Sequence, residues 1–495
     1  MFRVSRIACI CFLVVGLVSL SSGIAAGQSD EGRPPLNAEN AGELALLLTL
    51  EISGSDYFSP DGHYLLIAGE TDVALYDMLL PAESAEPVAL WTDVKYGNFS
   101  YDGRFLTLTN TTAAQLEVID LSTISASSEP AIRIDYPGDR PSHLFSQDNT
   151  RLFVKTGGPL RWYDLTGDLA TATANELGTD VTAFTLSPDN LHVAVIDSGG
   201  VMMFDLTTGE AVFTHALESG SLTISPGGTY LHITSQWCRV GGCSGSIEVY
   251  DWSTNELRLT VPIEGYVDRL VYSPDDTLAI YATNSTGSWS VYPNQGTTFY
   301  DAVVHVVDMA TGEDVFTIQE TDAVLTAMYF TADSSRVAYS SIIMQGQWPD
   351  WSSSVIHIVD LATEEATTIM AGGLIGALSD DWSVLRTTKG IYLPGTWTSG
   401  TGSAIAEVAT GTTVIDLANA YAVNNDLTLV VMADAADSTT MTVYTIMGDA
   451  LTTLAVEMDG VEAISSLSFS TIGNLIRAKF SVGESDYIAI WGLPG

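Results

Sequence analysis

The chain has 495 residues, 46% of them hydrophobic, and carries 60 Asp and Glu against 18 Lys and Arg, for a formal net charge of −42. Nucleic acid and anionic membrane surfaces are therefore poor partners, because binding to either needs clustered Lys and Arg. The same charge predicts an acidic, well-solvated surface, as suits an exported protein.

The N-terminus has the pattern of a secretory signal peptide. Basic residues precede an apolar run from Ile7 to Leu20, and small residues follow around Gly23–Gly27. This order is typical of an export signal that is later removed. We therefore predict a signal peptide at residues 1–27, a linker at residues 28–41, and a secreted or periplasmic product. No later stretch is long and apolar enough to span a bilayer, so we predict no membrane span after the signal.

One short motif recurs ten times in the rest of the chain, and Phe58–Gly62 (F-S-P-D-G) is its clearest copy. Pro sets φ for a tight turn, Asp can bond its own backbone two residues on, and Gly or Asn takes the position with positive φ. Alternating apolar residues on both sides predict strands, so each copy predicts a hairpin turn. The copies begin at Phe58, Phe99, Phe145, Leu186, Ile224, Tyr272, Phe330, Leu378, Val423 and Phe469.

A second motif follows each of the first seven copies, as an alternating strand that ends in Asp. V-A-L-Y-D, which ends at Asp77, is an example, and a turn such as T-T-G-E comes next in several copies. We predict that this Asp caps the turn by local hydrogen bonding. A residue repeated in seven units is a rule of construction and does not indicate an active site. The other six are Asp120, Asp164, Asp205, Asp251, Asp308 and Asp360.

These units resemble the WD-repeat and the bacterial YVTN-type and TolB-type propeller repeats, from about Leu44 to the C-terminus. The Trp-Asp pair of the first family is mostly replaced here by Tyr-Asp, Ile-Asp or Val-Asp, so the nearer likeness is to the bacterial repeats. The resemblance implies an all-β fold, a β-propeller of four-stranded antiparallel blades over residues 42–495. Ten units exceed the usual range of about four to eight blades. The alternatives are one large ring, a ring with irregular copies near Ser379–Met458, or two smaller rings.

The two ends of the chain carry complementary parts of one unit. Glu43–Ile52 reads as a fourth strand without predecessors, whereas Ser465–Trp491 supplies three strands and stops. In propellers of the kind that this chain resembles, the ring commonly closes by pairing strands from both termini. We therefore predict that the N-terminal strand completes the last blade, which favours a single domain.

The candidate binding residues lie in four insertions between the second and third strands of copies five to eight. Aromatic residues on polar, glycine-rich loops of a rigid scaffold are typical of recognition surfaces. Alternatively, these aromatics cover one another and give the loops small cores of their own. The insertions are Gln236–Gly245, Asn284–Ala302, Ile343–Ser353 and Tyr392–Ser403, and the candidates are Trp289, Tyr292, Trp348, Trp351 and Trp397.

Two cysteines remain after the signal, Cys238 and Cys243, with two glycines between them. In an oxidising compartment we expect them to form a disulfide. A loop this short removes little entropy from the unfolded chain, so the bond would define the shape of a loop rather than stabilise the fold. The alternative is a pair of free thiols.

The sequence contains no motif that indicates catalytic residues, a cofactor or a metal. His305 and His357 occupy the same position in two third strands, which marks them as repeat positions. Calcium is compatible with the many acidic turns but is not indicated, because it needs six to eight converging oxygens. We therefore predict a non-enzymatic module or scaffold that binds a protein or an extracellular glycan. The alternatives are a lactonase-like or polysaccharide-acting propeller with a metal or acids in its channel, and a structural component of the cell envelope.

Overall fold

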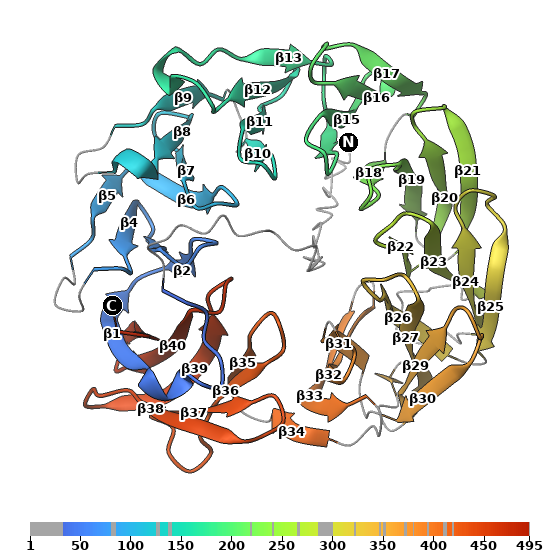
Figure 1. Ribbon diagram of the computed structural model, residues 1–495. Helices are drawn as coiled ribbons and strands as arrows, with labels where there is room; N and C mark the ends of the chain where they lie inside the picture. Colours follow the sequence, from blue (N-terminus) through green and yellow to red (C-terminus); the bar gives the residue numbers. More distant parts are fainter. Residues whose placement is uncertain are drawn as a thin grey trace, which may run out of the picture.

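The described residues form a closed ring of β-sheets (Figure 1). In the part of the chain that the computed structural model describes, ten antiparallel sheets follow one another, nine with four strands and one with five. The predicted β-propeller is confirmed. Of the three alternatives for its ten units, the structure shows one large ring, and the copies near Ser379–Met458 form regular sheets. The signal peptide predicted at residues 1–27 lies outside the described residues. These are residues 33–80, 86–124, 129–136, 141–217, 220–239, 242–264, 268–285, 300–320, 323–345, 348–349, 353–370, 374–379, 381–393, 396–408, 413–417 and 420–494.

Nine blades contain their strands in chain order, with the first strand nearest the centre of the ring, whereas the tenth takes its fourth strand from the N-terminus (Figure 1). Blades 1 to 5 comprise β2 (Ser55–Phe58), β3 (Tyr64–Ala68), β4 (Asp72–Asp77) and β5 (Ala89–Thr92); β6 (Val94–Phe99), β7 (Phe105–Asn110), β8 (Gln115–Asp120) and β9 (Ile132–Asp135); β10 (Ser142–Phe145), β11 (Arg151–Lys155), β12 (Leu160–Asp164) and β13 (Asn175–Leu177); β14 (Ala183–Leu186), β15 (His192–Asp197), β16 (Gly200–Asp205) and β17 (Ala211–His215); and β18 (Ser221–Ile224), β19 (Tyr230–Arg239), β20 (Gly242–Asp251) and β21 (Glu256–Glu264).

Blades 6 to 10 continue the ring, and β28 is an additional short strand beside β27. They comprise β22 (Asp268–Tyr272), β23 (Leu278–Ser285), β24 (Tyr300–Asp308) and β25 (Asp314–Glu320); β26 (Ala323–Phe330), β27 (Arg336–Gln345), β28 (Trp348–Pro349), β29 (Val355–Asp360) and β30 (Ala366–Met370); β31 (Leu374–Leu378), β32 (Val384–Leu393), β33 (Thr396–Glu407) and β34 (Thr413–Leu417); β35 (Tyr421–Val423), β36 (Leu429–Ala433), β37 (Thr440–Thr445) and β38 (Ala450–Ala455); and β39 (Val461–Phe469), β40 (Leu475–Val482), β41 (Ser485–Gly492) and β1 (Ala45–Ile52). Three short 3-10 helices are η1 (Ala41–Glu43), η2 (Leu121–Thr123) and η3 (Leu169–Thr171).

The F-S-P-D-G motif forms the turn between the first two strands of a blade, as predicted. In blade 2, the buried Ser100 donates from Oγ to Asp102 Oδ1 at 2.6 Å and accepts from the backbone N–H of Phe105 at 2.8 Å. Asp102 Oδ1 also accepts from Arg104 N at 3.0 Å. These bonds lie within six residues, which is why the sequence alone identifies the turn.

The last residue of this motif has positive φ in all ten blades, including those without glycine. Trp382 and Leu427 take this position in blades 8 and 9, with φ of 56° and 54°. For bulky side chains this region of backbone space is costly. The turn geometry is therefore imposed by the repeat even where the local sequence opposes it.

The Asp that ends the third strand caps the next turn, which confirms its structural interpretation. Asp120 Oδ1 accepts from Ser122 N at 3.0 Å, and Arg104 binds the same carboxylate at 2.9 Å. Partial burial disfavours the ionised form of Asp120, but the bonds from Arg104 and Ser122 outweigh it and hold the pKa below its usual range. The carboxylate therefore serves as a building element of the blade.

The hydrophobic core lies between neighbouring blades. One cluster joins Leu66 and Leu75 of blade 1 to Leu106 and Leu108 of blade 2, all four fully buried. Strands alternate their side chains between two faces, so each sheet contributes to the core on both sides. Burying one such leucine stabilises the fold by about 1.5–3 kcal/mol.

The ring closes where the two ends of the chain meet. β1 pairs antiparallel with β41, from Ala45 opposite Gly492 to Ile52 opposite Asp486, so the predicted closure is confirmed. The segment before β1 packs here too, since the buried Arg33 donates to the carbonyl oxygens of Met78 and Leu493.

Candidate functional site

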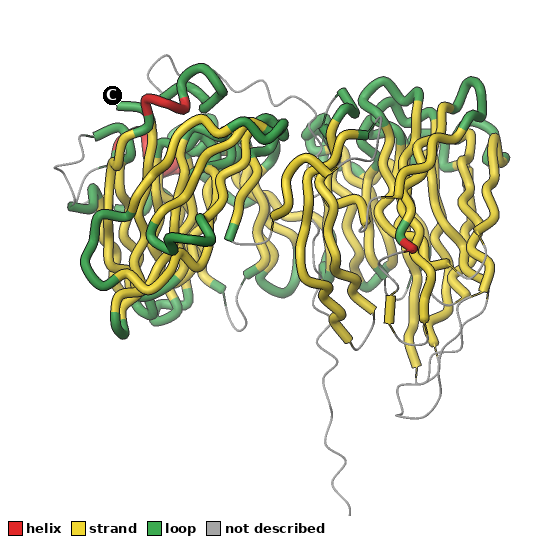
Figure 2. Tube along the Cα trace, turned by 90° about the horizontal axis from the view of Figure 1, so that it is seen from below, coloured by secondary structure: helices red, strands yellow, loops and turns green. Residues whose placement is uncertain are grey.

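The ring has two faces that differ in their connections. We call the face with the turns between first and second strands the turn face. The opposite face carries the connections between second and third strands, and we call it the hairpin face. Seen edge-on, the strands in the half of the ring that holds blades 5 to 8 extend farther on the hairpin face than those of the other half (Figure 2).

Strand lengths show the same difference between the two halves. In blade 1, β3 and β4 contain 5 and 6 residues, whereas in blade 5 β19 and β20 contain 10 each. In blade 8, β32 and β33 contain 10 and 12 residues. Four extra residues add about 14 Å to a strand. Blades 5 and 8 therefore project extended hairpins from this face.

The structure corrects one expectation about the insertions. Gln236–Gly245 and Tyr392–Ser403 were expected as loops, but most of their residues continue β19, β20, β32 and β33. The ladder continues into both insertions despite their glycines, because each added pair satisfies its backbone hydrogen bonds. These insertions therefore form extended hairpins.

The predicted site residues are only partly covered by the described structure. Trp348 lies in β28 and Trp397 in β33, opposite Tyr392, but the description there extends to the backbone alone. Trp289, Tyr292 and Trp351 lie outside the described residues. Whether these five side chains act together stays a prediction.

Cys238 and Cys243 are direct partners in the register of β19 and β20. Directly opposite positions bring two Cβ atoms within about 4.5–5.5 Å of each other. The side chains of both residues fall outside the described part, so the disulfide stays a prediction.

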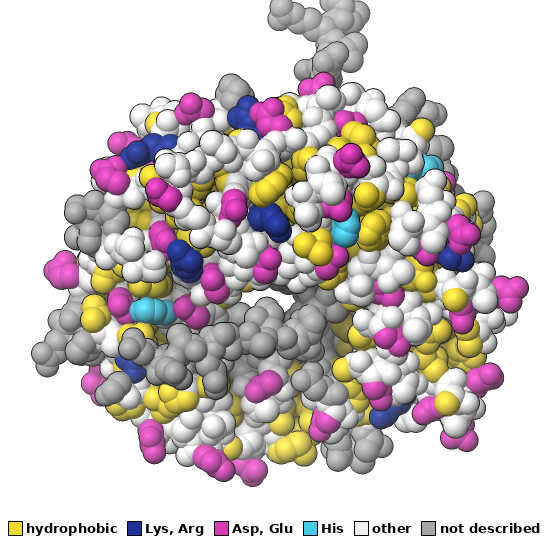
Figure 3. All heavy atoms as spheres, turned by 45° about the horizontal axis from the view of Figure 1, so that its top comes forward, with side chains coloured by type: hydrophobic (Ala, Val, Ile, Leu, Met, Phe, Trp, Pro, Cys, Tyr) yellow, Lys and Arg dark blue, Asp and Glu magenta, His cyan; other side chains and the backbone are white. Residues whose placement is uncertain are grey.

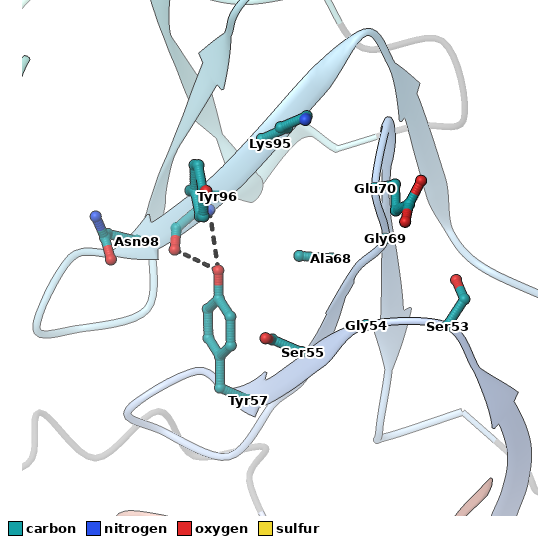
Figure 4. Close-up of a pocket in the computed structure, with 11 residues that line it drawn as sticks. Ser53, Gly54, Ser55, Tyr57, Ala68, Gly69, Glu70, Lys95, Tyr96 and Asn98 are labelled. Atoms are coloured by element: carbon teal, nitrogen blue, oxygen red, sulfur yellow. Dashed lines mark hydrogen bonds between the residues drawn. The ribbon is translucent and has the colours of Figure 1, made fainter. Parts of the chain in front are cut away.

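A pocket of about 500 Å³ opens on the hairpin face at the junction of blades 1 and 2 (Figure 4). Four segments line it: the connection from β1 to β2, β2 itself, the end of β3 with the turn to β4, and β6. Tyr57, Tyr96 and Asn98 lie along one side, with Ser53, Gly69 and Glu70 along the other (Figure 4). The complete lining is Ser53, Gly54, Ser55, Tyr57, Ala68, Gly69, Glu70, Lys95, Tyr96, Gly97 and Asn98.

A β-bulge in β6 presents Tyr96 at this pocket. The register with β7 shifts between Lys95 and Gly97, and Tyr96 has φ of 54° with 52% of its surface exposed. Tyr57 Oη holds the bulge, because it accepts from Gly97 N at 2.9 Å and donates to Gly97 O. Tyr57 thus positions the backbone next to Tyr96.

Glycines form the close-fitting parts of the pocket wall. A Cβ on Gly54 would lie 1.9 Å from Ala68 O, and one on Gly97 would lie 2.7 Å from a methyl group of Leu66. Neither contact is allowed for a real side chain. The backbone approach that shapes the pocket therefore depends on glycine at both positions.

The polar groups of the pocket carry both signs of charge. Lys95, from the inner strand of blade 2, and Glu70, from a turn of blade 1, both line it, together with serine and asparagine side chains. On the face seen in Figure 3, acidic side chains are scattered rather than gathered in one patch. The pocket is therefore a mixed polar and aromatic surface in an acidic protein.

The two repeated histidines have structural partners. His305 stacks on Tyr281 with ring centroids 4.7 Å apart and lies 3.1 Å from an Asp314 oxygen. His357 stacks on Tyr339 and lies 3.2 Å from Glu320, and burial lowers its pKa, although the carboxylate acts in the opposite direction. Within the described ranges, no group of three His, Cys, Asp or Glu side chains could hold a metal ion.

Sequence reasoning did not single out the pocket. Its residues come from two copies of the repeat and become neighbours only when the blades pack. One local signal was available, because Lys95-Tyr96-Gly97 interrupts the alternation of an inner strand. A glycine within a strand pattern indicates a bulge or a close approach of backbone.

Comparisons with known proteins name no function for the chain. No protein-family model and no curated protein matches the chain. Among solved structures it is similar to one described as the eukaryotic initiation factor, at 13% identity and a TM-score of 0.47, covering 82% of this chain and 88% of the other. The C-terminal WD40 domain of Sif2 is similar at 13% identity and a TM-score of 0.35, and the match covers 91% of this chain and 99% of the other. The dihydro-heme d1 dehydrogenase NirN is similar at 15% identity and a TM-score of 0.38, and the match covers 68% of this chain and 74% of the other.

These likenesses are too distant to indicate a ligand or a reaction. The ten sheets described above establish the fold by themselves. The predicted resemblance to WD-repeat-like propellers is confirmed at the level of architecture.

Proposed function

We propose that the chain is an exported, non-enzymatic propeller that binds a protein or an extracellular glycan through its hairpin face. The observation that supports this is the lengthening of the same hairpin in neighbouring blades, seen most clearly in blades 5 and 8. Loops and hairpins on a rigid scaffold are common binding elements. A propeller with such a face is suited to hold a partner and does not need a reaction centre.

Ring closure does not explain the long hairpins. Blades 1 to 4 belong to the same ring with second and third strands of 5 or 6 residues, such as β11 and β12. Residues added beyond that length lose conformational entropy on folding, at about 1–2 kcal/mol each. A partner that contacts the projecting hairpins would account for their retention.

The net charge limits the kind of partner. With a formal charge of −42, the chain repels anionic surfaces and attracts cationic ones. A basic protein surface or an uncharged glycan is therefore favoured. Binding to a basic protein should weaken as salt is added, because the Debye length falls from about 10 Å at 0.1 M to 3 Å at 1 M.

The test is a binding screen of the mature chain, Gln28–Gly495, against a glycan array and an extract of cell-surface proteins. The double variant Trp348→Ala, Trp351→Ala should lose a saturable hit and keep the thermal stability of the parent. Tyr101→Ala is the matched control, because Tyr101 is 42% exposed on the turn face. Undiminished binding by the double variant would refute the assignment of the hairpins.

Metal analysis of the same sample separates binding from catalysis. Stoichiometric metal in a protein that binds nothing would favour the propeller enzyme instead. In the described part of the chain, no helix is long and apolar enough to cross a membrane. Export remains part of the proposal, and fractionation of cells expressing the full chain tests it.

A further inference from the structure

We propose that the pocket between blades 1 and 2 is a second binding site, which takes a neutral saccharide ring against Tyr96. The inference does not depend on the hairpins, because the pocket lies across the ring from blades 5 to 8 (Figure 1). Both sites open on the same face. A glycan end held in the pocket would leave the rest of that face accessible to a second partner.

Tyr96 is exposed in a strained conformation. A tyrosine with φ of 54° is an outlier, and backbone strain of this kind is costly. Tyr96 is 52% exposed at the point where the register of the inner strand shifts. Such strain persists only when surrounding contacts impose it, and it is concentrated at functional sites.

The bulge is built into the surrounding structure. The Tyr57 hydroxyl makes two hydrogen bonds to the backbone of Gly97, one as donor and one as acceptor. A Cβ on Gly97 would lie 2.7 Å and 3.1 Å from methyl groups of Leu66 and Leu106, so a side chain there would have to displace both leucines. The platform is therefore preorganised, and a ligand binds without paying to order it.

Polar groups surround the aromatic ring in the pocket. Glu70 can accept hydrogen bonds from hydroxyl groups, and Lys95 can donate to them. The side-chain oxygen of Asn98 can also accept, while its Nδ2 lies 3.0 Å from His143 Nε2. A sugar ring presents an apolar face for an aromatic side chain and a rim of hydroxyl groups that are donors and acceptors. Tyr96 and the polar groups beside it match these two properties.

Charge selects among polar ligands. An anionic saccharide would meet the overall charge of −42 and the carboxylate of Glu70, with Lys95 as the one basic side chain in the lining. A small zwitterion such as an amino acid would satisfy Lys95 and Glu70, but it would leave most of a cavity of about 500 Å³ unfilled. A neutral mono- or disaccharide fits both the volume and the balance of charge.

The experiment titrates the mature chain with cellobiose, maltose, chitobiose and glycine by calorimetry and saturation-transfer NMR. We expect saturable binding of at least one disaccharide and none of glycine. Tyr96→Ala should weaken that binding by about tenfold or more, whereas Tyr96→Phe, which keeps the ring, should retain most of it. Glu70→Gln should weaken it by about threefold to tenfold, because one charge-assisted bond becomes neutral.

Two further variants separate this site from the hairpins. Tyr101→Ala, on the turn face of the same blade, should leave saccharide affinity unchanged, as should Trp348→Ala with Trp351→Ala. If no disaccharide binds at concentrations up to about 10 mM, or glycine binds instead, the proposal is overturned. Loss of saccharide binding in the hairpin variant but not in Tyr96→Ala would also overturn it, and would leave the proposed function standing.

Discussion

On the turn face, all ten blades repeat one arrangement, whereas on the hairpin face neighbouring blades differ. The last residue of each first turn has positive φ, from Gly62 in blade 1 to Gly473 in blade 10. On the hairpin face, two residues separate β15 from β16, which contain 6 residues each, but in blade 8 the corresponding strands contain 10 and 12 residues. The turn face thus builds the ring, and the hairpin face is free to vary.

Two blades lack the carboxylate of the turn motif, and blade 5 shows how it is replaced. Blade 5 has Gly227 and blade 10 has Ile472 where the other eight copies have Asp. In blade 5, Asp276 of blade 6 supplies the missing carboxylate, since it accepts from Ser225 Oγ at 2.6 Å, Gly227 N at 2.9 Å and Thr229 N at 3.0 Å. The bonds from Ser225 Oγ and Thr229 N match those that the motif's own Asp accepts in blade 2, but here the neighbouring blade makes them.

Among variants that test the difference between the two faces, Asp276→Ala on the turn face is expected to cause the largest loss of stability. Asp276 is only 4% exposed, and its loss leaves the buried Ser225 hydroxyl and the backbone N–H groups of Gly227 and Thr229 without their acceptor. We expect a loss of about 3 kcal/mol in the free energy of unfolding, measured by urea denaturation.

A double variant that moves the carboxylate back into blade 5 serves as the matched control for Asp276→Ala. The variant Gly227→Asp, Asp276→Gly should recover most of the lost stability. The backbone of Gly227 lies outside the left-handed region, and only Asp276 obstructs a Cβ there. Gly227→Asp alone should destabilise, because its Cβ would lie 2.7 Å from the Asp276 carboxylate. Additive effects of the two changes would show that the two positions are not coupled.

The next largest loss of stability is expected where the two ends of the chain close the ring. Arg33→Ala leaves the carbonyl oxygens of Met78 and Leu493 without their donor, at a cost of about 2 kcal/mol. Arg33→Lys should recover only part of the lost stability, since the ammonium group of lysine cannot reproduce the planar set of N–H donors on the arginine guanidinium. Thermal unfolding measures both variants, and a melting temperature equal to that of the parent in Arg33→Ala would contradict the role of this residue in closure.

Acid should reduce the stability that two aspartates of the turn face contribute to the ring. Hydrogen bonds from Thr331 and Ser335 lower the pKa of Asp333 to about 2; those from Ser273 and Thr277 do the same for Asp275, where they outweigh its slight burial. Both lie below the ordinary value of about 3.9. The stability they contribute is therefore present above pH 4 and is lost as the pH falls toward 2.

Urea unfolding at several pH values measures this loss. Asp333→Asn with Asp275→Asn keeps acceptor oxygens that do not titrate, so the double variant should show a flatter dependence between pH 4 and pH 2. An unchanged slope would mean that these carboxylates do not contribute to acid sensitivity.

The smallest effect on stability is expected on the hairpin face. Trp348→Ala with Trp351→Ala should change the free energy of unfolding by no more than about 0.5 kcal/mol, as surface substitutions do. A loss of several kcal/mol would instead indicate that the aromatics form small cores of their own. The comparison of the two faces would then fail, because both would stabilise the ring.

Sequence reasoning succeeded where the interactions are local. The bonds of Ser100, Asp102 and Arg104 span a few residues, so the motif predicts its own turn. The pairing of Glu43–Ile52 with the C-terminal strands was also predictable, because the two ends hold complementary parts of one unit. Extended hairpins were mistaken for loops, since a polar, glycine-containing segment does not reveal whether its two halves pair.

The sequence by itself determined the repeat, its turns, the capping aspartates and the closing strand, because each depends on φ preferences and hydrogen bonds within one unit. Only the packing of the blades brings residues of different repeat units into contact. Asp276 reaches a turn 49 residues away, and Tyr57 holds a bulge 40 residues away, in the next blade. The number of blades in the ring and the pocket at Tyr96 depend in the same way on how one sheet packs against the next, which no single repeat encodes.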